Sequence, residues 1–79
     1  MSRYTILIYP DDDAYSVVVP ALPGCVTWGR TLEEATANAE EAIAGYVEVL
    51  RKRGEDVPTE DHPPFVTTVS VEIGETVPA

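Results

Sequence analysis

The chain has 79 residues, 44% of them hydrophobic and 24% charged, which is the balance of one small soluble globular domain. Fourteen acidic against five basic residues give a net charge of -9, and this excess argues against direct nucleic-acid binding, which depends on Lys and Arg neutralising phosphates. One cysteine excludes an internal disulfide, and neither a signal peptide nor a membrane span is present, so we expect a cytoplasmic protein.

Two hairpins are predicted in the first third of the chain. The segment Arg3–Tyr9 is β-branched and aromatic with apolar residues at both parities, which is typical of a central strand covered on both faces. A turn over Asp11–Asp13 leads into a returning strand, Ala14–Ala21. Pro23-Gly24 then turns the chain into a short third strand, Cys25–Trp28.

One long helix follows. Thr31 and Glu34 form a capping box, in which the Thr31 oxygen accepts an N–H of the first turn and Glu34 reaches back to the Thr31 N–H. The helix is predicted to end near Arg53, with Gly54 as a left-handed cap. Its apolar residues share one face. They are Leu32, Ala35, Ala39, Ala42, Ile43, Tyr46, Val47 and Leu50. The alanines should let this face pack closely on one side of a sheet.

The last strand is predicted at Phe65–Ile73, after a polar connection that contains prolines. A helical crossover places this strand parallel to the first one, which gives a four-stranded mixed sheet of order 3-2-1-4. The fold class is therefore α+β, with the order β-β-β-α-β and one helix on one face, as in the opening half of a ribonuclease H-like sheet. We expect a single domain over 1–79, with sheet and helix in 3–73 and a frayed tail at 74–79.

No residue constellation predicts an enzyme. Cys25 would need a base to act as a nucleophile, and the only histidine, His62, lies in the acidic connection with nothing to place it nearby. We therefore expect Cys25 to be a small buried side chain. One cysteine and one histidine provide no zinc spacing, so we expect neither a metal nor a cofactor.

The three aspartates of the first turn leave three alternatives open. Asp11, Asp12 and Asp13 form a solvated turn, an acidic contact for a partner, or a cation site. A ribonuclease H-type nuclease needs carboxylates on the first strand to hold two metal ions, and 4–9 contains none. This difference argues against nuclease activity.

Two surfaces are candidates for protein contact. If Cys25 points inward, alternation turns Val26 and Trp28 outward, on the sheet face away from the helix. Such a patch either binds a protein or is covered by the chain's own loops. The outer helix face, including Glu41 and Glu48, is either solvated or a second contact. Small residues beside these glutamates would let a partner approach closely: Ala37, Ala44 and Gly45.

A specific motif spans Val19 to Ile43. It reads V-P-x-L-P-G-C followed by V-T-x-G-x-T-L-E-E-A-x-x-N-A-x-E-A-I, and it closely resembles the HicB family of antitoxins of type II toxin-antitoxin systems. The resemblance extends over 4–58 and implies a partial ribonuclease H-like fold without catalytic carboxylates. It also implies a partner, the small basic HicA toxin, which cleaves mRNA with a histidine and is neutralised when the antitoxin covers it. The acidic charge suits that partner.

The chain departs from the family pattern at two positions. Ala21 and Arg30 stand where the family often has acidic residues, so both remove negative charge near the Pro23-Gly24 turn. Many members also continue into a DNA-binding domain, and we expect none here. The alternative is an orphan HicB-like interaction or regulatory module. Because so short a chain buries only about 60 to 65% of its unfolded surface, we also expect a homodimer or higher oligomer.

Overall fold

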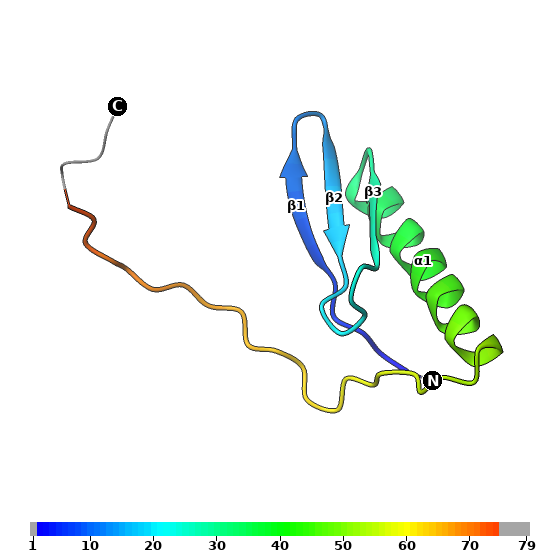
Figure 1. Cartoon of the computed structure of the whole chain (residues 1–79). Helices are drawn as coiled ribbons and strands as arrows, with labels where there is room; N and C mark the ends of the chain where they lie inside the picture. Colours follow the sequence, from blue (N-terminus) through cyan, green and yellow to red (C-terminus); the bar gives the residue numbers. More distant parts are fainter. Residues whose placement is uncertain (1, 75–79) are drawn as a thin grey trace.

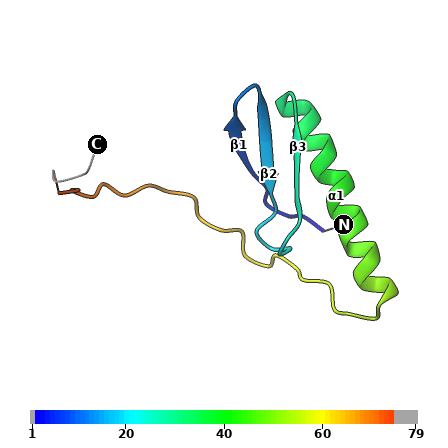
Figure 2. The ribbon, with the colours of Figure 1, turned by 45° about the horizontal axis from the view of Figure 1, so that its top comes forward.

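The computed structural model describes residues 2–74. It contains three strands and one helix: β1 (Leu7–Asp11), β2 (Ala14–Val18), β3 (Val26–Gly29) and α1 (Leu32–Lys52). The strands form one antiparallel sheet of order β1-β2-β3, and α1 packs on one face of it, mainly over β3 and β2 (Figures 1 and 2). The predicted α+β class and the predicted hairpins are confirmed. No helix in this part of the chain is both long and apolar enough to cross a membrane.

Tight turns fix the sheet register. The turn between β1 and β2 contains Asp12 with φ 56°, a left-handed conformation that aspartate tolerates better than most residues. Gly24, with φ 80°, reverses the chain before β3. Backbone hydrogen bonds close this second turn, from the N–H of Val19 to the C=O of Cys25 at 3.1 Å and from the N–H of Cys25 to the C=O of Leu22 at 3.0 Å. The predicted Pro-Gly turn is therefore present.

The N-terminal cap of α1 forms with one change of partner. The Thr31 side chain accepts a hydrogen bond from the N–H of Glu34 at 3.0 Å, as predicted. The Glu34 carboxylate, however, accepts the N–H of Arg30 at 2.6 Å, not that of Thr31. Thr31 has φ -127° and ψ 166°, the extended backbone angles typical of an N-cap residue. The prediction for Glu34 was wrong by one residue.

The C-terminal end of α1 closes as expected. Gly54 has φ 71°, and its N–H donates to the C=O of Arg51 at 3.1 Å. The N–H of Glu55 donates to the C=O of Leu50 at 2.9 Å. This pair of bonds satisfies carbonyls that the last helical turn leaves free, and it requires the left-handed residue that glycine supplies.

The first core cluster lies where α1 begins. Val17 packs against Ala35 and Ala39, and all three are almost completely buried. The approach is very close at Gly29, where a Cβ atom would stand 2.3 Å from the backbone nitrogen of Ala35. Leu32, which was predicted to face the sheet, is 53% exposed, because it precedes this point of contact as the first helical residue.

The second core cluster lies under the middle of α1. Val19, Leu22 and Cys25 are buried there, so the predicted burial of Cys25 is confirmed. Tyr46 packs against the cluster from the helix, and its hydroxyl donates to the C=O of Pro23 at 2.8 Å. This bond ties the helix to the turn that leads into β3.

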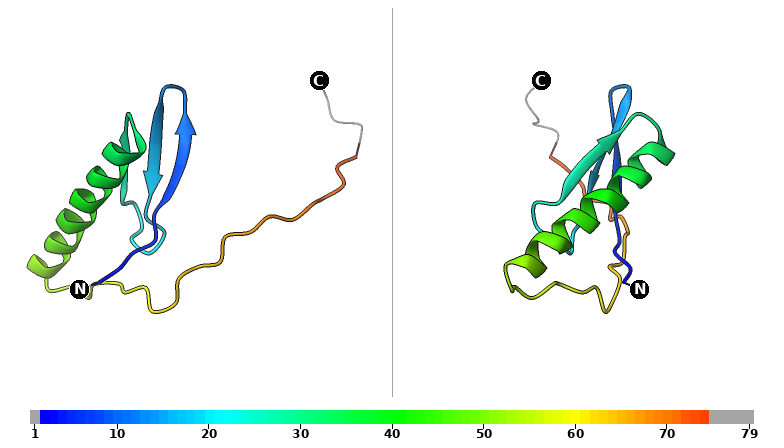
Figure 3. Two further views of the ribbon diagram at one scale, coloured as in Figure 1. Left: turned by 180° about the vertical axis from the view of Figure 1, so that it is seen from behind. Right: turned by 90° about the vertical axis from the view of Figure 1, so that its right-hand side faces the viewer.

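The predicted fourth strand is not formed within the described chain. Residues 55–74 have no regular secondary structure, and Figure 3 shows them leaving the domain. As a result, β1 is an edge strand and not the central strand that the pattern of Arg3–Tyr9 predicted, and it begins only at Leu7. The structure contains the 3-2-1 part of the predicted order. Of the predicted tail, residues 75–79 lie outside the described residues.

The connection after α1 is anchored beside the segment that precedes β1. The hydroxyl of Tyr4 donates to the C=O of Pro58 at 2.7 Å, and the N–H of Thr5 donates to the Glu60 carboxylate at 2.9 Å. These bonds hold the connection beside the segment that leads into β1. Pro63-Pro64 follows, and neither proline has an N–H to donate to a β-ladder.

Candidate protein-binding surface

The sheet face opposite α1 is open. Val26, Trp28 and Tyr9 are 63%, 54% and 51% exposed, respectively, so the outward directions predicted for Val26 and Trp28 are confirmed. The strand register places the side chains of this face in two rows across the sheet. The rows are Tyr9, Ser16 and Trp28, and Leu7, Val18 and Val26. We call these six residues the open face.

The backbone that carries Trp28 is held by the helix. The side-chain amide of Asn38 donates to the C=O of Trp28 at 2.8 Å. The next residue, Gly29, is buried against the start of α1. The indole is therefore exposed on a strand whose position is fixed, and this rigidity lowers the entropic cost of binding a partner.

The three aspartates lie beside the open face. Asp11 is paired with Ala14 at the end of the hairpin, and Asp12 and Asp13 are also exposed. In Figure 1 this turn lies at the same end of the molecule as the start of α1. Within residues 2–74, no group of three or more His, Cys, Asp or Glu side chains could hold a metal ion. The geometry supports an acidic rim at one end of an apolar patch.

The helix glutamates are separated from this patch. Glu41 and Glu48 are exposed on α1. The Glu48 Oε2 atom lies 3.8 Å from the Nζ atom of Lys52 in an exposed ion pair. Because α1 covers the other side of the sheet, one flat partner cannot cover these glutamates and Trp28 together. The predicted contact residues therefore form two surfaces and not one.

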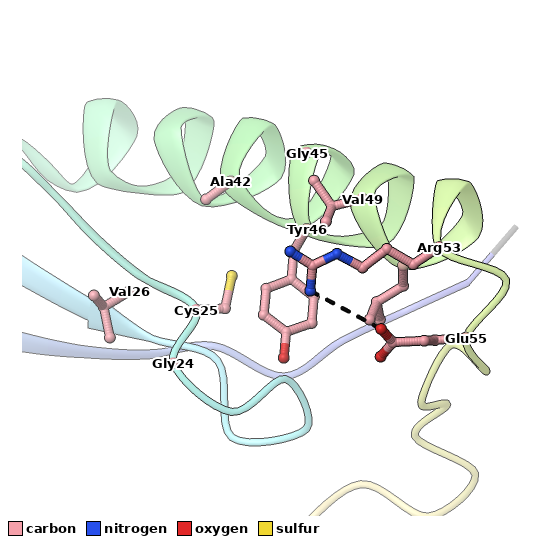
Figure 4. A pocket seen from close by; sticks show the side chains of 10 residues that line it. Gly24, Cys25, Val26, Ala42, Gly45, Tyr46, Val49, Arg53 and Glu55 are labelled. Carbon is pink, nitrogen blue, oxygen red and sulfur yellow. Dashed lines mark ion pairs between the residues drawn. The ribbon is translucent and has the colours of Figure 1, made fainter.

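A groove runs between the start of β3 and the C-terminal half of α1 (Figure 4). Its volume is about 530 Å³, and the ion pair between Arg53 and Glu55, at 3.9 Å, lies in its wall. The other lining residues include Cys25, Val26, Ala42, Gly45, Tyr46 and Val49. A Cβ atom at Gly45 would meet nothing within 4 Å, so the helix surface there is open. Sequence reasoning missed the groove but singled out Gly45 as a place where a partner could come close.

Cys25 has no activated thiol in this groove. It is 5% exposed, and burial raises its pKa above the ordinary value of 9.0, so the thiol stays protonated at neutral pH. His62 is exposed in the connection after α1. The environment of Cys25 supports a packing role.

Glu60 anchors the connection that follows α1, and this contact shifts its pKa. Its carboxylate accepts hydrogen bonds from the Thr5 hydroxyl and the Thr5 N–H, and these bonds lower its pKa below the ordinary value of 4.5. The charged form of Glu60 is therefore the one that holds the chain after α1 in place.

Comparison with known proteins identifies the family. The family described as "HicB_like antitoxin of bacterial toxin-antitoxin system" matches residues 4–70. A UPF0150 protein of Thermoplasma acidophilum is 50% identical over 60 residues, which are 75% of this chain and 87% of that protein. A UPF0150 protein of Archaeoglobus fulgidus is 46% identical over 55 residues, which are 68% of this chain and 78% of that protein.

A solved structure agrees with the sequence match. The N-terminal domain of the Burkholderia pseudomallei antitoxin HicB superposes with a TM-score of 0.62 and 40% identity, and the match covers 81% of this chain and 69% of that chain. Both comparisons confirm the resemblance that the motif from Val19 to Ile43 indicated. The chain belongs to the HicB-like antitoxin family of toxin-antitoxin systems.

Proposed function

We propose that this protein is an antitoxin that binds and neutralises a small, basic, mRNA-cleaving toxin of the HicA type. Membership of the HicB-like family is the observation that carries the proposal. The net charge of -9 supports it, because an acidic domain attracts a basic partner and speeds their association. In this role the domain acts in the cytoplasm by covering its partner, without catalysis and without direct contact with nucleic acid.

We assign the contact to the open face, with Val26 and Trp28 at its centre. An exposed apolar patch with a large aromatic side chain is typical of the energetic core of an interface, and charged residues usually form the rim. Here Asp11, Asp12 and Asp13 supply an acidic rim that suits a basic toxin. Glu41 and Glu48 lie on the other side of the domain, where they add long-range attraction.

We also propose that Phe65–Ile73 becomes the fourth strand on the free edge of β1, which would give the 3-2-1-4 order of a partial ribonuclease H-like fold. The alternation of apolar and polar residues in this segment suits a strand covered on one face. Ile43 and Val47 support the proposal from the helix, since both are only half-buried.

One observation favours a second function. Ala21 and the exposed Arg30 lie on the connections before and after β3 and lack the negative charge common at these places in the family. A domain that has lost toxin contacts there would act as an orphan interaction or regulatory module.

Co-expression with the neighbouring reading frame separates these functions. If a short, strongly basic frame lies next to this one, its product should co-purify with the tagged antitoxin, and adding the antitoxin should stop cleavage of a test mRNA. An unrelated basic protein of similar size, mixed in the same buffer, controls for attraction by charge alone. Absence of such a frame, together with purification of the tagged chain without a basic partner, would support the orphan module and contradict the antitoxin function.

A further inference from the structure

Trp28 lies on an edge strand, because β3 is hydrogen-bonded only to β2 within residues 2–74. Ser16 and Trp28 face each other in the register of these two strands. Three steps further along the same register, the N–H of Val19 donates to the C=O of Cys25 at 3.1 Å. Hydrogen-bonded and non-bonded pairs alternate along an antiparallel ladder, so a pair three steps from a bonded one exchanges no bonds. The N–H and C=O of Trp28 therefore point away from β2, toward the free edge of the sheet.

The side chain of Asn38 reaches this edge from α1. Its amide nitrogen, Nδ2, donates to the C=O of Trp28 at 2.8 Å. The N–H of Gly29 belongs to the same planar peptide unit and points the opposite way, toward β2. Gly29 faces Tyr15 one step further along the register, where the alternation places a hydrogen-bonded pair. One peptide unit is therefore held from both sides, by the helix at its oxygen and by β2 at its N–H.

Asn38 is an unfavourable residue for the helix that carries it. It lies inside α1 between Ala37 and Ala39, and asparagine is a weaker helix former than alanine. Asn38 is half-buried, at the flank of the helix face that packs on the sheet, one helical turn after the buried Ala35. From this position its amide bonds to the strand and not to the backbone of α1. The bond to Trp28 offsets the weaker helix propensity.

We propose that Asn38 is a positioning residue for toxin binding, which fixes the backbone of Trp28 so that the indole is presented to the toxin in one orientation. This inference rests on the proposed function, in which Trp28 is a central contact. The indole is 54% exposed, so few contacts of its own restrain it, and its direction depends on the peptide unit that Asn38 holds. Without that bond the indole would be ordered only on binding, and this ordering would weaken the complex.

The free protein provides the first test, with N38A as the variant. Trp28 is the only tryptophan of the chain, so its indole N–H gives a single NMR signal. In N38A the order parameter of this N–H should fall, and the amide of Gly29 should exchange with solvent faster. T36A is the matched control, because the Thr36 hydroxyl also donates to a backbone carbonyl at 2.8 Å, but to that of Leu32 within α1. T36A should leave both signals unchanged, and both variants should keep the helical signal in far-UV circular dichroism.

Binding kinetics with the basic protein encoded by the neighbouring reading frame provide the second test. N38A should dissociate about 5-fold faster than the wild type, as expected for the loss of one hydrogen bond. Its association rate should stay within about 2-fold, because the net charge of -9 is unchanged.

A double-mutant cycle then shows whether Asn38 acts through Trp28. In a W28A background, N38A should change the dissociation rate by less than about 2-fold. An indole that is equally ordered in N38A and the wild type would overturn the proposal, as would an unchanged dissociation rate or an effect that persists in W28A. A wild-type chain that binds no basic toxin would contradict the proposed function instead, and the order parameter of the indole would still decide whether Asn38 holds Trp28.

Discussion

Replacing Gly29 with alanine tests how closely α1 sits on β3. A Cβ atom at Gly29 would lie 2.3 Å from the backbone nitrogen of Ala35, 2.6 Å from its Cα and 2.8 Å from the backbone carbon of Glu34. Ordinary contacts of a Cβ atom begin near 3.4 Å, so the start of α1 must move by roughly 1 Å. All three atoms belong to the backbone, which cannot move aside as a flexible side chain does. The shift would also separate Ala35 from Val17 in the first core cluster.

The expected loss in the free energy of unfolding follows from this overlap. Overpacking a well-packed core lowers the free energy of unfolding by about 1 to 3 kcal/mol. Because the new Cβ atom would clash with three backbone atoms, we expect G29A to lose about 3 kcal/mol or more. A domain of this size has a total stability of about 4 to 12 kcal/mol, so the variant should lose a large part of it. Urea unfolding followed by far-UV circular dichroism measures the change.

A second glycine provides the control. Gly45 lies inside α1, and a Cβ atom there would meet nothing within 4 Å. G45A should therefore stabilise the domain by about 1 kcal/mol through its higher helix propensity. A G29A variant within about 0.5 kcal/mol of the wild type, the scatter of ordinary surface substitutions, would refute the close seating of α1 on β3.

Three further predictions concern the cap, the connection and the open face. T31A removes the acceptor of the Glu34 N–H and should cost about 1 kcal/mol in urea unfolding; no measurable change would contradict the cap. Because the pKa of Glu60 is lowered in the folded state, its bonds to Thr5 stabilise the fold fully above pH 4.5, the ordinary value. This stabilisation is lost as the pH falls below 4.5 and then through the lower pKa of the folded state. The stability difference between wild type and E60Q should therefore shrink in acid, and a difference that stays constant would contradict this assignment. W28A should weaken toxin binding about 30-fold in calorimetry while changing stability little, because the indole is 54% exposed; equal affinities would place the toxin elsewhere.

Local patterns in the sequence predicted the features that depend on near neighbours. Thr31 caps α1, Gly54 ends it in a left-handed conformation, and the small side chains of Ala35 and Ala39 face the sheet. The alternation of side chains along β3 also predicted that Trp28 points outward, given that Cys25 points inward. In each case the outcome depends on backbone geometry over a few residues, so a single sequence is sufficient.

Features that depend on distant contacts were not predictable in this way. The apolar residues at both parities of Arg3–Tyr9 indicated a central strand, but the position of β1 depends on where the chain after α1 runs. That path is fixed by Glu60, whose bonds to Thr5 join residues 55 positions apart. Gly29 is near in sequence to the backbone of Glu34 and Ala35 that it meets, but this contact depends on how the start of α1 is seated on β3. For the same reason the groove beside Gly45 became visible only in the structure.

The position of α1 keeps the two predicted contact surfaces apart. Because the helix lies mainly over β3 and β2, the open face lies on the other side of the sheet from α1. Val26 and Trp28 are on β3, so a toxin that covers them would leave Glu41 and Glu48 on the helix in water. These glutamates would therefore act on a basic toxin by long-range attraction, which raises the rate of association without adding contact residues.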